Sequence, residues 1–185
     1  LFVSRGFLAD VAAFDLRTGK ILWRSPIAGI RADHMDISPD GKKLFVSAII
    51  RGGDIVQVLD TRNGKKLGHF ETGDWPHDVH VSADGGRVFV ASLGDMETAE
   101  TERNQNGRTY RVTVADTKSL KILQEYIFDS GVRPFQISEQ RNILYAQLSN
   151  THALVARDLQ SDQQIRRLDL PVRAGVTEAD WDFEA

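Results

Sequence analysis

Apolar and polar residues alternate along short stretches of this chain, as they do in β-strands that bury one face. Residues 54–59 (DIVQVL) are one example, rich in valine, isoleucine and leucine. Turn-forming residues such as glycine and aspartate bound these stretches. No stretch shows the period of about 3.6 residues that marks an amphipathic helix. The pattern therefore predicts an all-β protein built of short strands.

A short apolar motif recurs along the chain at long and similar intervals. It reads LFVS at 1–4, LFVS at 44–47, VFVA at 88–91 and LYAQ at 144–147. A second motif follows in step, as DLRTGK at 15–20, DTRNGK at 60–65, DTKSLK at 116–121 and DLQSD at 158–162. The first motif recurs after 43, 44 and 56 residues, and the aspartate of the second after 45, 56 and 42 residues. Both motifs share one long interval, so one repeat carries an insertion of about a dozen residues.

A third motif precedes the first and predicts a tight turn. It reads ISPDG at 37–41, VSADG at 81–85 and ISEQ at 137–140. Proline presets φ, aspartate bonds the local backbone and glycine accepts positive φ, so Pro-Asp-Gly favours a turn. Each repeat thus reads as strand, Asp-Gly turn, strand, loop, strand, Asp-x-x-x-Gly turn, strand.

Four strands in a repeat of about 44 residues are typical of the blades of a β-propeller. One blade cannot bury both of its faces, so blades stack around an axis. An antiparallel sandwich or a solenoid is the alternative, but neither predicts turn motifs that recur in phase. We expect an all-β β-propeller of four-stranded antiparallel blades, with about four repeats in this chain.

The phase of the motifs predicts the limits of the blades. The expected units are a partial blade at 1–29, blades at about 30–70, 74–127 and 131–170, and the start of a further blade at 171–185. A closed ring takes about four to eight blades. We expect a fragment of a larger, seven-bladed ring; the alternative is a four-bladed ring in which the C-terminal residues complete the first blade.

The segment 37–47 (ISPDGKKLFVS) resembles the YVTN-type repeat of bacterial and archaeal propellers, which are similar to WD-repeat proteins. The segment 58–65 (VLDTRNGK) resembles the second half of that repeat, and the resemblance extends over nearly the whole chain. The chain departs from the WD pattern, since no Trp-Asp pair ends its strands. The resemblance implies a secreted or periplasmic bacterial protein that binds a small molecule, a metal or a protein. Similar propellers also occur in lactonases and redox enzymes.

Composition and charge exclude several classes of function. The formal net charge of −3 gives no basic surface for nucleic acid, and there are no cysteines for disulfides, thiolate chemistry or haem attachment. No apolar run reaches the length of about 18 residues expected of a membrane-spanning helix. The segment carries no signal peptide. Motifs for phosphate binding, for a nucleophile elbow and for a His-Glu-x-x-His zinc site are also missing.

Antiparallel connectivity sorts the loops onto two faces of a propeller. One face carries the tight Asp-Gly turns, which have a structural role. The other carries the loops that lead into each innermost strand, including 73–77, and the acidic, polar insertion at 94–107. Irregular loops on a regular scaffold often carry function, although this insertion also has the composition of a solvated excursion.

The first strand of each blade lines the central channel, so polar residues there should gather in rings. Alignment on Ser38, Ser82 and Ser138 predicts one ring of Asp36, His80 and Gln136 and another of Asp33, His77 and Arg133. The candidate ligand-binding residues at this channel mouth are Asp33, His34, Asp36, Trp75, His77, His80, Arg133 and Gln136. The alternative is that these side chains line water or satisfy backbone groups between blades.

A divalent metal at the channel mouth is a further possibility, with His34, Asp36, Asp78 and His80 as candidate ligands. No cofactor is predicted beyond this. Successive side chains of a strand point to opposite faces, so His77 and His80 should not bind one ion unless the strand is bent.

The sequence supports three hypotheses for function. The first is a non-catalytic binding or scaffold module that takes a small-molecule or protein ligand at the channel mouth. The second is a lactonase-like or metal-dependent propeller enzyme. The third is a propeller domain of a larger redox enzyme. Because the catalytic motifs named above are missing, the first is favoured.

Overall fold

The computed structural model describes residues 1–51, 53–99, 110–149, 151–171 and 175. Within these ranges the chain folds into antiparallel strands, with one short 3-10 helix at Gly6–Leu8. The strands form four sheets, one of three strands and three of four strands. The prediction of an all-β chain is therefore confirmed.

Each sheet is a meander in which neighbours along the chain are also neighbours in the sheet. The first sheet contains β1 (Phe2–Ser4), β2 (Asp10–Phe14) and β3 (Ile21–Pro26). The second contains β4 (Arg31–Ile37), β5 (Lys43–Ile49), β6 (Ile55–Asp60) and β7 (Lys66–Glu71). The third contains β8 (Pro76–Val81), β9 (Arg87–Ser92), β10 (Arg111–Asp116) and β11 (Ile122–Ile127). The fourth contains β12 (Val132–Ser138), β13 (Ile143–Leu148), β14 (Ala153–Asp158) and β15 (Gln164–Asp169).

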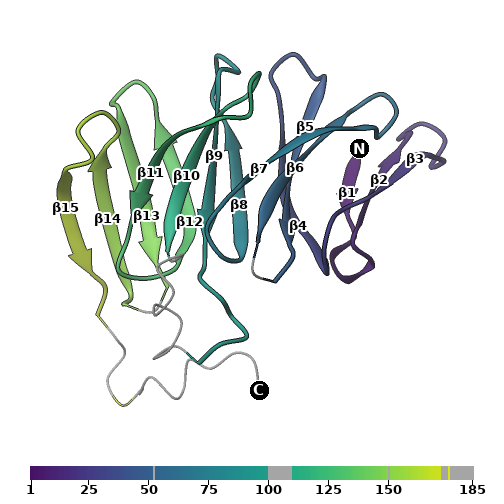
Figure 1. The fold of residues 1–185 in the computed structure, drawn as a ribbon. Coiled ribbons are helices and arrows are strands. Elements are labelled where there is room, and N and C mark those ends of the chain that lie inside the picture. Colours follow the sequence, from purple (N-terminus) through teal and green to yellow (C-terminus); the bar gives the residue numbers. More distant parts are fainter. Residues whose placement is uncertain (52, 100–109, 150, 172–174, 176–185) are drawn as a thin grey trace.

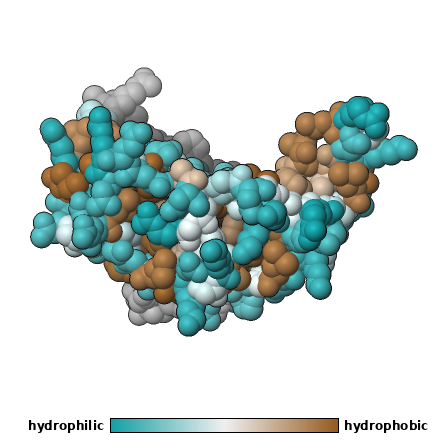
Figure 2. All heavy atoms as spheres, turned by 90° about the horizontal axis from the view of Figure 1, so that it is seen from above, coloured by the Kyte–Doolittle hydropathy of each residue, from teal (hydrophilic) through white to brown (hydrophobic). Residues whose placement is uncertain are grey.

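The four sheets stand side by side in the order of the sequence (Figure 1). Neighbouring sheets approach each other along their first strands, where β4 lies against β8 and β8 against β12. Seen from above, the described part of the molecule is a curved arc (Figure 2). This is the arrangement of propeller blades, with β4, β8 and β12 innermost. The predicted start of a further blade at 171–185 lies outside the described residues, apart from 171 and 175.

The hydrophobic core consists of layers between successive sheets. Val11 of the first sheet packs with Leu44 and Leu59 of the second. In the next layer Phe45 and Phe70 pack with Val79 of the third sheet, and the layer after that joins Tyr126 to Leu144. Each of these layers needs residues from two sheets, so the blades stabilise one another rather than folding singly.

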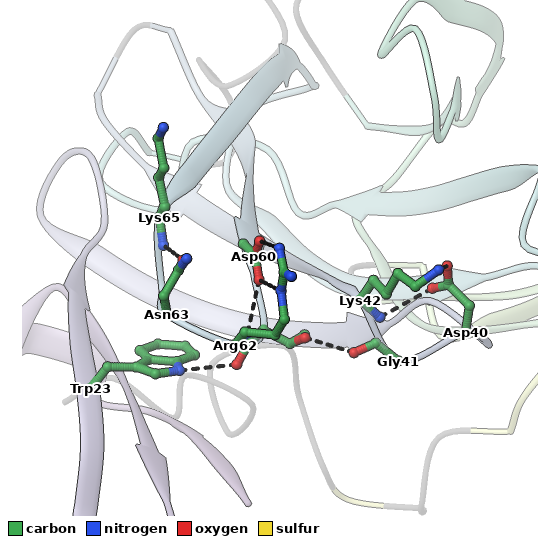
Figure 3. Close-up of polar contacts among 9 residues, drawn as sticks. Trp23, Asp40, Gly41, Lys42, Asp60, Arg62, Asn63 and Lys65 are labelled. Atoms are coloured by element: carbon green, nitrogen blue, oxygen red, sulfur yellow. Dashed lines mark hydrogen bonds and ion pairs between the residues drawn. The ribbon is translucent and has the colours of Figure 1, made fainter.

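The predicted turns lie together at one end of the blades. Ser38 donates a hydrogen bond from its hydroxyl to Asp40 at 2.7 Å, and Gly41 has φ of 71°. The Thr61 hydroxyl donates to the Gly41 carbonyl at 2.7 Å, which ties the second turn of the blade to the first (Figure 3). The Trp23 indole N–H donates to the Thr61 carbonyl at 3.0 Å, and so joins this turn to the preceding blade (Figure 3).

Asp60 shows what the aspartate does in the second turn of each repeat. Its carboxylate accepts hydrogen bonds from the backbone N–H of Arg62 at 2.9 Å and from the Arg62 guanidinium at 2.8 Å (Figure 3). The guanidinium first, and then the backbone N–H, lower the pKa of Asp60 to about 2. The Asp60 carboxylate and the Thr61 hydroxyl thus have partners within the turns, which fits a structural role for this end of the blades.

Candidate functional site

The opposite end of the blades carries an irregularity that recurs in the three innermost strands. In β4, Ala32 and Met35 are three residues apart but face Ala48 and Val46, which are two apart. Pro76 and Val79 of β8, and Val132 and Phe135 of β12, show the same shift against their partner strands. Each strand therefore has one extra residue, which is a β-bulge. The bulges lie at Asp33-His34, His77-Asp78 and Arg133-Pro134.

The bulge changes which side chains share a face. In β8 the buried Pro76 and Val79 face the same side although they are three residues apart, because their partners Ser92 and Val90 are two apart. The strict alternation assumed for His77 and His80 therefore does not hold across this segment. The bulge thus bends β8 between His77 and His80, which is the condition that the sequence analysis set for both histidines to approach one ion.

His34, His77 and Asp33 form a compact polar cluster between two blades. The imidazole rings of His34 on β4 and His77 on β8 have centroids 4.0 Å apart. Asp33 Oδ1 lies 3.0 Å from His34 Nδ1, and Asp33 Oδ2 lies 3.6 Å from Arg31 Nε. One potential ligand atom from each of Asp33, His34 and His77 lies within 4.8 Å of the other two. The bulges thus bring together three side chains that the sequence placed only at the same mouth.

The two histidines of β8 have opposite electrostatic surroundings. Burial, and then the neighbouring His34, lower the pKa of His77 to about 4. The interaction of His80 with Asp78, whose Oδ2 lies 3.5 Å from His80 Nε2, raises the pKa of His80 above its ordinary value. Burial raises the pKa of Asp78, but His80, the backbone N–H of Phe135 and His34 together outweigh this and leave that pKa below its ordinary value. At neutral pH His77 is therefore an uncharged imidazole, whereas His80 and Asp78 form an ion pair more readily.

His80 and Asp78 also contact the next blade. The His80 ring packs edge-on against Phe135 of β12, with centroids 4.8 Å apart. The backbone N–H of Phe135 points to Asp78 Oδ2 at 3.5 Å. The pair therefore joins two innermost strands while remaining partly exposed.

Asp36, one of the candidate ligand-binding residues, bonds the backbone of two blades. Its carboxylate accepts hydrogen bonds from the backbone N–H of Ile37 at 2.8 Å and of Val81 on the next blade at 2.7 Å. Both oxygens thus have backbone partners across the blade interface. This arrangement corresponds to the alternative in which polar residues at the channel satisfy backbone groups.

The remaining candidates lie around the same mouth. Arg133 and Gln136 are exposed on β12, and the charge of Arg133 contributes to the lowered pKa of His77. Trp75 precedes β8 with φ of 52° and is half-buried. A ligand-binding role for these residues stays a prediction.

Asp54 is a residue of this end that the sequence reasoning missed. Only 2% of it is exposed, and its carboxylate accepts the backbone N–H groups of Ile50 at 2.5 Å and Trp75 at 2.6 Å. It therefore fixes the loop before β6 against the loop that positions Trp75. The sequence feature that could have revealed this role is an aspartate directly before a strongly apolar strand.

The acidic insertion at 94–107 begins on the same end of the blades. Glu97 pairs with Arg51, from the loop between β5 and β6, with Oε1 and Nη2 2.5 Å apart. The predicted sorting of these two loops onto one face agrees with this contact. Residues 100–107 of the insertion lie outside the described residues.

The fold and these strand ends define a β-propeller arc with a polar surface at its inner edge. This fold matches 818 chains of solved structures. The architecture is therefore shared too widely to define an activity. No protein-family model and no curated protein matches this chain.

Two solved structures illustrate the likeness in fold. Kuenenia stuttgartiensis hydrazine synthase is 22% identical over 90% of this chain and 44% of that chain, with a TM-score of 0.72. The computationally designed Ika8 protein is 15% identical over 91% of this chain and 46% of that chain, with a TM-score of 0.68. This chain spans less than half the length of either structure. None of the helices in the described residues is long and apolar enough to cross a membrane.

Proposed function

We propose that this chain is part of a YVTN-type propeller that acts as a binding or scaffold module, with a small molecule or a protein bound at the inner strand ends. The observation that carries this proposal is the bulge shared by β4, β8 and β12. Bulges re-aim side chains at functional sites. Here the bulges lie beside a compact cluster of Asp33, His34 and His77, whereas the carboxylates of Asp40 and Asp60 in the turns of the other end are bonded locally.

The resemblance to YVTN-type repeats supports the remaining parts of the proposal. It favours a bacterial protein exported to the periplasm or secreted, in a ring of seven blades.

The open face of the fourth sheet supports a larger ring. Tyr145 occupies the register position of Phe45 and Phe89, since these three residues pair with the ring of Gln136, Asp36 and His80 on the innermost strands. Phe45 and Phe89 are 0% and 1% exposed, whereas Tyr145 is 37% exposed.

The other residues of this face show the same contrast. Leu154 and Leu168 face each other across β14 and β15, as Val56 and Phe70 do in the second blade. A hollow of about 250 Å³ lies here, lined by Tyr145, Leu154, Val155, Ala156, Arg166 and Leu168. In the second and third blades the equivalent surface is covered by the next sheet, so a further blade fits here.

A fragment screen by nuclear magnetic resonance tests the binding proposal. Metal-free ¹⁵N-labelled protein is titrated with a library of small polar molecules, and the amides that shift are mapped. Binders should shift amides of 33–36, 75–80 and 133–136. His80→Ala and Arg133→Ala should weaken those binders, whereas Arg62→Ala at the opposite end should not. Binders that map only to the turns at 38–43 and 60–65, or variants without effect, would contradict the proposal.

A further inference from the structure

We infer that Asp33, His34 and His77 form a binding site for a divalent transition-metal ion of the Zn²⁺ type, built across the interface between the second and third blades. This deepens the proposed function, because it names a ligand for the same inner strand ends. The ligand atoms belong to two different strands, β4 and β8, and lie within 4.8 Å of one another. The site therefore depends on how the blades stack and not on a local sequence motif.

The donor set selects the kind of ion. Two imidazole nitrogens and one carboxylate oxygen suit Zn²⁺ and its neighbours in the first transition series. Ca²⁺ takes about six to eight oxygen ligands, which these three residues do not offer. Three protein ligands around a tetrahedral ion leave one position for water or for an oxygen of a small ligand.

The distances are compatible with binding after a small adjustment. Ligand atoms around a tetrahedral ion, with bonds of about 2.0–2.1 Å, lie about 3.4 Å apart. The two imidazole rings already approach to 4.0 Å between centroids. The His34 side chain is 50% exposed, so it can rotate toward the ion, whereas Asp33 is only 11% exposed and sits against Arg31. His34 is therefore the ligand that can adjust its position, and Asp33 is the ligand whose position is fixed.

His77 supplies a second, independent observation. Its Nδ1 is buried and has no hydrogen-bond partner among the described residues. Buried polar side-chain atoms nearly always have a partner, so an unpartnered one requires an explanation. Coordination to a metal ion would account for an imidazole nitrogen in this position.

The backbone around His34 and His77 is itself fixed. The buried Ser47 hydroxyl lies 3.0 Å from the His34 carbonyl oxygen and 3.2 Å from the His77 carbonyl oxygen. The single hydroxyl proton is shared between the two carbonyl oxygens, so one side chain links both bulges. Metal sites rely on such outer contacts to orient their ligands.

Zn²⁺ titration of the intact, chelator-treated protein by isothermal calorimetry tests this inference. One ion should bind per chain, and Co²⁺ in its place should give the visible absorption of a tetrahedral complex. His34→Gln and Asp33→Asn should each weaken Zn²⁺ binding about tenfold or more. His69→Gln, an exposed histidine on β7 far from the inner edge, is the matched control and should leave binding unchanged.

His34→Gln is the primary variant because half of the His34 side chain is exposed, so we expect the variant to fold. Circular dichroism of each variant confirms that it is folded. Wild-type protein that binds no Zn²⁺, or His34→Gln that binds it as the wild type does, would overturn the metal site. The fragment screen above uses metal-free protein, so its result is independent. Fragments that still map to the inner ends would leave the binding module standing without the metal.

Discussion

At the scale of single residues, His77 and His80 lie only three residues apart, yet their pKa values are shifted in opposite directions. His77 is held between His34 and the protein interior, and its pKa falls to about 4. His80 has the carboxylate of Asp78 as a neighbour, and its pKa rises. The chain therefore keeps one neutral and one readily charged imidazole at the same strand end.

The two histidines should affect stability in opposite directions as pH changes. His77 has a folded pKa below its unfolded value of about 6.5, so the unfolded chain binds more protons between pH 6.5 and 4 and stability falls as pH falls. His80 has a raised folded pKa, so its contribution is complete below pH 6.5 and is lost as pH rises through the folded pKa.

Urea unfolding of His77→Gln and His80→Gln at pH 7 and pH 5 measures this difference. His77→Gln should lose less free energy of unfolding on acidification than the wild type, by about 1–2 kcal/mol after allowance for solvent screening. His80→Gln should lose more than the wild type. Identical pH dependence in all three proteins would contradict the assigned surroundings of both imidazoles.

Ser47 and Ser92 are two buried serines with different hydrogen bonding. Each is 0% exposed, but the Ser47 hydroxyl shares its proton between two bulge carbonyls, whereas the Ser92 hydroxyl has no partner among the described residues. Ser47→Ala should cost about 1–3 kcal/mol of unfolding free energy, because it removes the buried hydroxyl that both bulge carbonyls share. Ser92→Ala should stay within about 0.5 kcal/mol. Equal costs in chemical denaturation would show that Ser47 does not hold the bulges.

At the scale of elements, the repeated motifs predicted most of the strands and turns. Turn chemistry is local, so ISPDG at 37–41 and DTRNGK at 60–65 carry enough information to place a turn without tertiary contacts. The sequence could also predict which strand of each blade is innermost, because the phase of the motifs orders the strands.

The bulges were not predicted, although the sequence contained a signal for them. A bulge shifts backbone pairing without changing the local composition, so the alternation of side chains alone does not reveal it. The signal is a spacing of three between apolar residues at equivalent positions. It is present at Ala32 and Met35, at Pro76 and Val79, and at Val132 and Phe135. The cluster of Asp33, His34 and His77 required this geometry and the stacking of two blades.

The buried carboxylate of Asp54 connects two loops and should be essential to their arrangement. Asp54→Asn keeps the shape but removes the charge that receives two backbone N–H groups. It should lower the free energy of unfolding by about 1–3 kcal/mol and change the fluorescence of Trp75. Asp15→Asn, whose bonds lie in an exposed turn, is the control and should cost less than about 1 kcal/mol. A cost for Asp54→Asn no greater than the control's would contradict this role.

At the scale of the whole molecule, the stacking of blades makes equivalent residues differ in burial. Val112 of the third blade and Leu154 of the fourth occupy the same register position, since their partners across the sheet are Tyr126 and Leu168. Val112 is 0% exposed and Leu154 is 42% exposed. The difference arises because the third blade is covered by the fourth and the fourth is covered by nothing among the described residues.

A charge at these two positions distinguishes a covered blade face from an open one. In the 185-residue chain, Val112→Glu should unfold the protein or cost about 4 kcal/mol or more, because it buries an unpaired carboxylate. Leu154→Glu should stay within about 0.5 kcal/mol in the same chain. In a closed ring, a further blade covers Leu154, and Leu154→Glu should then cost as much as Val112→Glu. Thermal and chemical unfolding of both variants gives the comparison.

The central claim is that these sheets are blades whose innermost strands share one polar channel mouth. A crystal structure of the intact protein tests this claim most directly. We expect β4, β8 and β12 to surround a common axis, with Asp33, His77 and Arg133 at one mouth and the surface around Tyr145 and Leu168 covered by another blade. A structure with β7, β11 and β15 nearest the axis, or with that surface open to solvent, would contradict the account.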